Sequence, residues 1–296
     1  MKKNPLMELI LLLFIASGCS STPSIAPTMT SLPSSATPSV TASPTFTSTS
    51  TSTPTPVPGG PCDNPLVPLV TGAIYEYRVT TPDGPALFTL NVKDRKDIGN
   101  INIEVQIIDH KHAWDIQELV ICQEGEIVNF PLYVMSMLMV DYLQNILNTY
   151  HYHESAPYAP AFPVLADKGW VHTWEPGYQL EENVTLKNPM GGANLFMSGM
   201  SPIDVKFQME GNRETVDVPA GLYAEALEIK VDYHMVATII QEAAGCSVDL
   251  HTTQWYVPYL GLVRAEIDTT EMNYAGQTFQ AEIVSLLELV EFTPGP

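Results

Sequence analysis

Apolar and polar residues alternate along much of the chain between residues 74 and 292, with the two-residue period of a half-buried β-strand. The clearest case is 227–235, where five apolar residues alternate with charged residues and a histidine. The same alternation is present in 75–79, 88–92 and 101–107, and further strand signals run through 255–267 and 279–292. One face of each strand is therefore buried and the other faces water, which is typical of an antiparallel sheet. Residues 284–290 are apolar on both faces, which predicts a central strand.

Turn residues separate these strands. Pro82-Asp83-Gly84 and Pro219-Ala220-Gly221 each lie between two strand segments and predict hairpin connections. One segment departs from the two-residue period, because Leu132–Leu147 has apolar residues at helical spacing and a polar stripe. The predicted fold class is therefore mainly β, a curved antiparallel sheet with one covering helix.

The N-terminal region has the features of an export signal. Residues 1–18 combine two lysines with a short apolar core that is about half of the ~20 residues a membrane-spanning helix needs. This leader ends in Ala16-Ser17-Gly18-Cys19, which resembles the lipobox of bacterial lipoproteins. The resemblance implies that Cys19 becomes a diacylglyceryl cysteine, also carrying an amide-linked fatty acid such as palmitate. The mature protein would then be anchored to the cell membrane or the outer membrane, on the extracytoplasmic side.

Residues 19–60 follow as a tether. Ser, Thr and Pro dominate residues 20–60, which contain no charged residue, so this stretch cannot bury enough apolar surface to fold and is predicted to be disordered. The predicted organisation is a signal peptide over 1–18, a lipidated tether over 19–60 and a single β-rich domain over 61–296.

Three short motifs carry a family resemblance. They are Asn64-Pro65 with the following Pro68-Leu69, Gly72 and Tyr75-x-Tyr77, then Val218-Pro219-Ala220-Gly221, then Trp255-Tyr256-Val257-Pro258-x-x-Gly261-Leu262-Val263. Together they resemble an uncharacterised family of bacterial envelope lipoproteins with a VPAG hairpin and a WYxPxxGLV strand. The resemblance implies a half-barrel like that of lipoprotein carriers, in which a curved sheet encloses an apolar cavity.

The net charge of the chain excludes one class of binding partner. The formal net charge of −20 repels phosphate backbones, so no nucleic-acid partner is expected.

With Cys19 lipidated, three cysteines remain for an oxidising compartment. Cys62 and Cys122 are the favoured disulfide, because their pairing would fasten the start of the domain, but a bond from Cys246 to either of them stays open.

Adaptable apolar residues suggest a ligand site. Met135 and Met139 lie in the predicted helix, and Phe196 and Met197 lie in a Gly/Ser-rich segment. Methionine adapts to irregular surfaces, so these four residues are candidates for lining a cavity for a hydrophobic small molecule or lipid. The competing interpretation is that both segments complete the core.

Histidine provides weak metal candidates. His110-x-His112 and His151-x-His153 each place two imidazoles on one face of an extended segment, and Zn²⁺ accepts imidazole ligands. Apart from Glu154, neither pair has a cysteine or acidic third ligand at standard spacing. We therefore expect no metal site and no cofactor.

The chain contains no GxSxG, HExxH, SxxK or P-loop motif, so we expect a non-enzymatic module, and a hydrolase is only the third hypothesis. The leading hypothesis is a surface lipoprotein that binds a hydrophobic ligand or serves as an envelope scaffold. The alternative is a surface module that recognises a glycan or a protein through the aromatic run Tyr150, Tyr152, Tyr158 and Phe162.

Overall fold

The computed structural model describes residues 62, 64–94, 101–111, 114–140, 143–146, 156–186, 195–239, 244–274, 277–280 and 285–296. Within them, fourteen strands and two short helices are formed. The strands are β1 (Ile74–Thr81), β2 (Gly84–Asp94), β3 (Ile101–Asp109), β4 (Trp114–Gln123), β5 (Glu126–Ile127), β6 (Leu143–Ile146), β7 (Val171–Trp174), β8 (Gly177–Leu186), β9 (Leu195–Val218), β10 (Gly221–Ile239), β11 (Ala244–Val257), β12 (Gly261–Tyr274), β13 (Gln277–Gln280) and β14 (Leu286–Thr293). The helices are α2 (Tyr133–Leu138) and α3 (Phe162–Asp167).

The predicted leader, Cys19 and the tether lie outside the described residues. None of the helices in the described ranges has the length and apolar character needed to cross a membrane.

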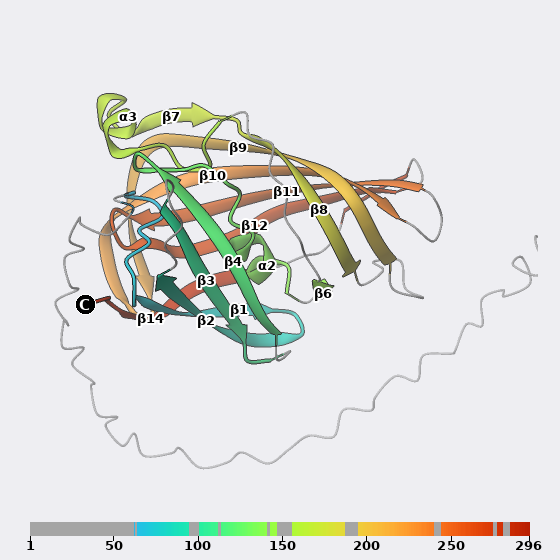
Figure 1. Cartoon of the computed structure of the whole chain (residues 1–296), viewed down its shortest axis with the longest axis horizontal. Helices are drawn as coiled ribbons and strands as arrows, with labels where there is room; N and C mark the ends of the chain where they lie inside the picture. Colours follow the sequence, from blue (N-terminus) through green and yellow to red (C-terminus); the bar gives the residue numbers. More distant parts are fainter. Residues whose placement is uncertain are drawn as a thin grey trace, which may run out of the picture. The chain divides into compact units, whose positions relative to one another are not determined.

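All fourteen strands belong to one antiparallel sheet. Their order is β5-β4-β3-β2-β1-β14-β12-β11-β10-β9-β8-β6, while β13 pairs with β12 and β7 pairs with β9. The sheet curves, so that β1–β4 face β10–β12 across an interior that contains α2 (Figure 1). The fold is mainly β, a curved antiparallel sheet with two short helices among the described residues, and this confirms the predicted fold class.

Local sequence signals account for several of these elements. The Pro82-Asp83 turn joins β1 to β2, and Gly84 has a left-handed φ of +100° that suits glycine. The predicted turn after Val218 joins β9 to β10. The apolar segment near the C-terminus forms β14, which lies between β1 and β12, so the prediction of a central strand is confirmed.

The predicted helix over Leu132–Leu147 is wrong in its extent. Helix α2 covers only Tyr133–Leu138, and Leu143–Ile146 form β6, which pairs with β8. Five of the six residues of α2 are buried, so it is an interior helix rather than an amphipathic one. A helix this short has little stability of its own, and the backbone partners that β8 offers outweigh the helical spacing beyond Met139.

Candidate functional site

The inner face of the sheet is filled by the chain's own residues. The segment Asn64–Leu69 crosses this face, and its Leu66, Val67 and Leu69 side chains are buried. The Tyr75 hydroxyl donates a hydrogen bond to the carbonyl oxygen of Pro68 at 3.2 Å, which holds this segment against β1. The segment therefore packs against the inner face beside the start of β1 and the turn between β11 and β12.

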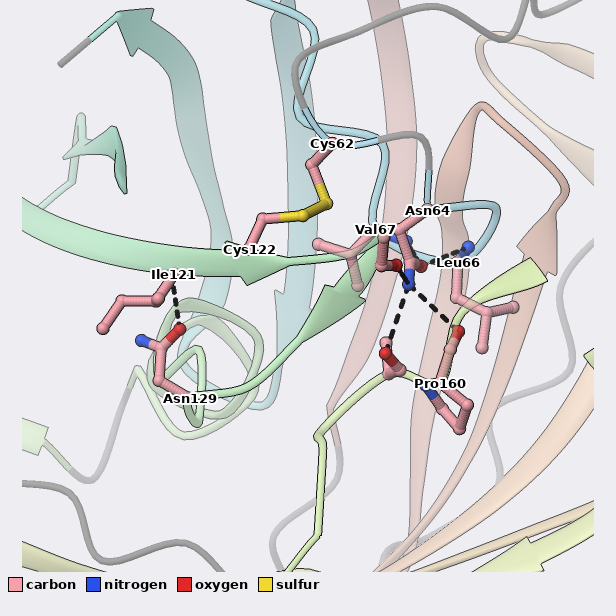
Figure 2. Close-up of a disulfide and its surroundings, with 10 residues drawn as sticks. Cys62, Asn64, Leu66, Val67, Ile121, Cys122, Asn129 and Pro160 are labelled. Carbon is pink, nitrogen blue, oxygen red and sulfur yellow. Dashed lines mark hydrogen bonds between the residues drawn. A yellow bond between two sulfur atoms is a disulfide. The ribbon is translucent and has the colours of Figure 1, made fainter. Parts of the chain in front are cut away.

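Asn64 fastens the segment on both sides. Its Nδ2 donates to the carbonyl oxygens of Gly125 at 2.8 Å and Pro160 at 3.1 Å, and its Oδ1 accepts the backbone N–H groups of Leu66 and Val67 at 3.0 Å each (Figure 2). A buried asparagine with both ends of its amide bonded links the segment to the turn between β4 and β5 and to the chain before α3.

A disulfide adds a covalent link at the same place. Cys62 is bonded to Cys122 on β4, so the favoured pairing is confirmed (Figure 2). Cys246 is a free, buried thiol, which rules out the alternative pairings. Burial raises the pKa of the Cys246 thiol above its ordinary value.

The spaces beside the segment are small. One of about 20 Å³ lies between Leu66 and the Tyr77 and Tyr133 side chains, and one of about 10 Å³ lies between Val67 and Trp174. A single water needs about 10–15 Å³, so neither space holds more than a water or two. Neither one accommodates a lipid.

The four predicted cavity residues lie in two different parts of the chain. Met135 and Met139 are buried in the core around α2, as the competing interpretation expected. Phe196 and Met197 lie in β9, but their side chains lie outside the description. The prediction for Phe196 and Met197 therefore lies outside the described side chains.

Glu118 is a buried carboxyl on the inner face. Its Oε1 accepts the backbone N–H of Leu132 at 2.7 Å, and Oε2 has no hydrogen-bond partner among the described residues. Burial raises the pKa of Glu118 to about 8, although the hydrogen bonds from the Leu132 and Tyr133 backbone act in the opposite direction. The residue is only 2% exposed, so the carboxyl is closed to substrates and its role is structural.

Of the predicted metal candidates, the structure describes only His110. Nε2 of His110 is hydrogen-bonded to the Thr89 hydroxyl oxygen at 2.9 Å, while His112, His151 and His153 lie outside the described residues. Within the described ranges, no three His, Cys, Asp or Glu side chains are placed to ligate one metal ion.

An aromatic surface patch forms where α3, β7 and the turn between β11 and β12 meet. We define the α3–β7 patch as Phe162, Trp170 and Tyr259. The Phe162 ring centroid lies 6.2 Å from that of Trp170 and 6.2 Å from that of Tyr259. The Arg213 guanidinium lies 5.6 Å from the centroid of the Trp170 ring, within cation–π range.

Exposed apolar side chains concentrate around this patch. Phe162, Val164 and Val171 are 40%, 38% and 57% exposed, and they are three of the seven large exposed hydrophobic residues in the described part of the chain. Single exposed hydrophobic residues are ordinary, whereas a cluster of them marks an interaction surface.

The backbone under the patch is strained. Trp170 has φ of +61° and Tyr259 has φ of +62°, and they are two of the three non-glycine residues with positive φ in the described part. Bulky residues rarely adopt the left-handed region, and each such position costs roughly 1–3 kcal/mol. The fold keeps both aromatic residues there at this cost, and such strain gathers at functional sites.

The sequence prediction found only part of this patch. Phe162 belongs to the aromatic run and is exposed, but Tyr158 is buried, so its interpretation as an exposed platform residue is wrong. Tyr150 and Tyr152 lie outside the described residues. Trp170 was not predicted; it is partly buried and packs against the core.

No protein-family model matches this chain, and no curated protein matches its sequence. Two solved structures are similar to it. One is a protein from Bacteroides fragilis that is predicted to be exported and has a YmcC-like fold, with 15% identity, coverage of 78% of this chain and 99% of the other, and a TM-score of 0.46. The other is a predicted lipoprotein from Parabacteroides distasonis, with 17% identity, coverage of 78% and 100%, and a TM-score of 0.47.

Proposed function

We propose that this chain is an exported, lipid-anchored, non-enzymatic module that docks a protein partner through the α3–β7 patch. The observation that carries the proposal is the contact of Phe162 with Trp170 and Tyr259 at the surface, on a backbone strained at two of the three positions. The lipid anchor rests on the resemblance of Ala16–Cys19 to a lipobox.

The chemistry of the patch favours a protein over a glycan. The Phe162 ring is tilted by 60° against Trp170 and by 42° against Tyr259, so the three rings do not form one flat stacking surface. Arg213 also lies over the Trp170 ring that a sugar would stack on. Trp, Tyr and Arg beside exposed apolar residues are the types enriched at the centres of protein interfaces.

The hypothesis of a hydrophobic ligand has less support. It requires an apolar cavity on the inner face, where Leu66 and Val67 lie and the adjoining spaces measure about 20 and 10 Å³. A drug-sized ligand needs roughly 300 Å³ or more. The surface patch, by contrast, is already formed.

Site-specific photocrosslinking tests this proposal in the bacterium that produces the protein. A benzophenone amino acid at Phe162 of the full chain is expected to capture one protein partner. The matched control places the same amino acid at Leu87, an exposed apolar position on β2 in the other half of the sheet. Trp170→Ala should abolish capture from position 162, because it removes the ring that Phe162 contacts.

Three results would contradict the docking proposal: equal capture at both positions, capture at 162 that Trp170→Ala leaves unchanged, or no captured protein at all. In the last case, retention of the full chain on immobilised glycans that is lost in Trp170→Ala would support the glycan alternative instead.

A further inference from the structure

Two copies of the sequence Asp-x-His lie on neighbouring strands. They are Asp232-Tyr233-His234 on β10 and Asp249-Leu250-His251 on β11. The antiparallel register places Asp232 opposite His251 and His234 opposite Asp249. Because side chains alternate between the two faces of a strand, all four of these side chains lie on the face opposite the buried Tyr233 and Leu250.

In both Asp–His pairs, the imidazole directs its Nδ1 atom toward the aspartate on the neighbouring strand. Nδ1 of His234 lies 2.6 Å from Oδ1 of Asp249, and Nδ1 of His251 lies 2.7 Å from Oδ1 of Asp232. An ionised carboxylate only accepts hydrogen bonds, so Nδ1 carries the proton in each ring. In the neutral form of each ring, the lone pair available to a metal is therefore that of Nε2.

This arrangement has the chemistry of a metal site. A histidine that ligates a metal commonly donates its other ring N–H to a carboxylate, which fixes the tautomer and raises the basicity of the ligand nitrogen. His234 and His251 occupy diagonal positions on adjacent strands, about 7–8 Å apart at their Cα atoms, a span that two imidazoles can bridge with a metal between them.

The surroundings favour a cation. The four side chains line a surface hollow of about 530 Å³, to which Glu175 and Asp204 add two further carboxylates. Lys206 also lines the hollow, and its ammonium group is paired with Glu175 at 3.1 Å. Next along the sheet, Asp249 faces Glu271 of β12.

We propose that His234 and His251 bind one transition-metal ion such as Zn²⁺ or Cu²⁺ through their Nε2 atoms. Asp249 and Asp232 orient the two rings. Since no three potential ligands in the described ranges are placed around one ion, the chain supplies two ligands and water completes the coordination. The hollow next to the metal leaves room for a donor group from another molecule.

The test uses the full chain, purified in detergent and treated with a chelator. Zn²⁺ binding is measured by calorimetry, and Cu²⁺ is used in electron paramagnetic resonance to detect coupling to nitrogen ligands. We expect one ion per chain. The Asp232→Asn and Asp249→Asn variants should each lower the affinity about 10-fold to 100-fold, and His234→Ala and His251→Ala at least as much.

His110→Ala is the matched control, because the His110 ring already bonds Thr89, and it should leave binding unchanged. The proposal is overturned if Zn²⁺ fails to bind at about 1 mM. The proposal is also overturned if Zn²⁺ binding survives in the His234→Ala/His251→Ala double variant. The same holds if the surviving binding then depends on His112, His151 or His153. Asp→Asn variants that bind as tightly as the unmodified chain would remove the proposed role of the carboxylates.

Discussion

The Glu118 carboxyl couples a single proton to the stability of the whole domain. In the folded chain its pKa is raised to about 8, against an ordinary value of 4.5. Between these two pH values the folded state keeps a proton that the unfolded state releases. The folded state therefore binds more protons, and stability falls as pH rises through this window.

We predict that, as the pH rises from 5 to 8, the titration of this one group lowers the free energy of unfolding by up to about 1.4 kcal/mol per pH unit. In Glu118→Gln this contribution disappears, because glutamine does not titrate. Urea unfolding of both proteins at several pH values measures it. Glu104→Gln is the control, since Glu104 lies on the adjacent strand β3 and is only partly buried. If the stability difference between the unmodified chain and Glu118→Gln does not change with pH, the Glu118 carboxyl is ionised in the folded state.

The sequence contained a sign of this residue. Glu118 interrupts an apolar face that Ile116, Val120 and Cys122 otherwise continue along β4. Alternation alone indicates that Glu118 points inward. It does not indicate that the start of α2 would supply backbone donors, because Leu132 reaches the carboxyl only through the fold.

At the scale of elements, the Cys62–Cys122 disulfide fastens the inner segment Asn64–Leu69 to the sheet. The bond closes a loop of about 60 residues, and the chain-entropy model gives roughly 4 kcal/mol for such a loop. We predict that replacing both cysteines with serine lowers the free energy of unfolding by about this amount. Reductant should destabilise the unmodified chain similarly and leave the double variant unaffected.

Cys246→Ala serves as the control for this prediction, because Cys246 is a free, buried thiol. It should remain as sensitive to reductant as the unmodified chain. If reductant leaves the unmodified chain unchanged, or if Cys246→Ala abolishes the sensitivity, the assigned disulfide is wrong.

Elements set by local chemistry could be predicted, and those set by distant partners could not. The Pro82-Asp83-Gly84 turn and the apolar β14 carry their own signals in the sequence. The change from helix to strand after Met139 depends on β8, which follows about 40 residues later. The α3–β7 patch is similar, since Tyr259 and Phe162 meet only through the fold, in which the Tyr259 backbone N–H donates to the carbonyl oxygen of Pro65 at 2.8 Å.

At the scale of the whole molecule, the proposed lipid anchor would determine where the module works. We predict that labelled palmitate is incorporated into the full chain and that the protein sediments with membranes. Cys19→Ala should abolish both, since only Cys19 follows the lysine-bearing apolar leader over residues 1–18, whereas Ala243-Ala244-Gly245 before Cys246 has no such leader. Cys246→Ala should change neither. Labelling that persists in Cys19→Ala would place the acyl chain elsewhere or reject the anchor.

The net charge of −20 and the α3–β7 patch together define the expected partner, a protein with an apolar contact surface that tolerates an acidic neighbour. Two charged groups near the patch, Arg213 and Glu225, are already paired with each other at 3.8 Å. The rings of Phe162, Trp170 and Tyr259 are therefore expected to supply most of the binding energy.

The most direct test is the affinity of the full chain for the protein captured from position 162, measured with purified components. Central aromatic residues of an interface contribute about 2 kcal/mol or more, so Trp170→Ala and Phe162→Ala should each weaken binding about 30-fold or more. Leu87→Ala, an exposed apolar change on β2, should leave the affinity within about 2-fold. If the patch variants bind as tightly as the unmodified chain, or if Leu87→Ala weakens binding equally, the α3–β7 patch is not the docking surface.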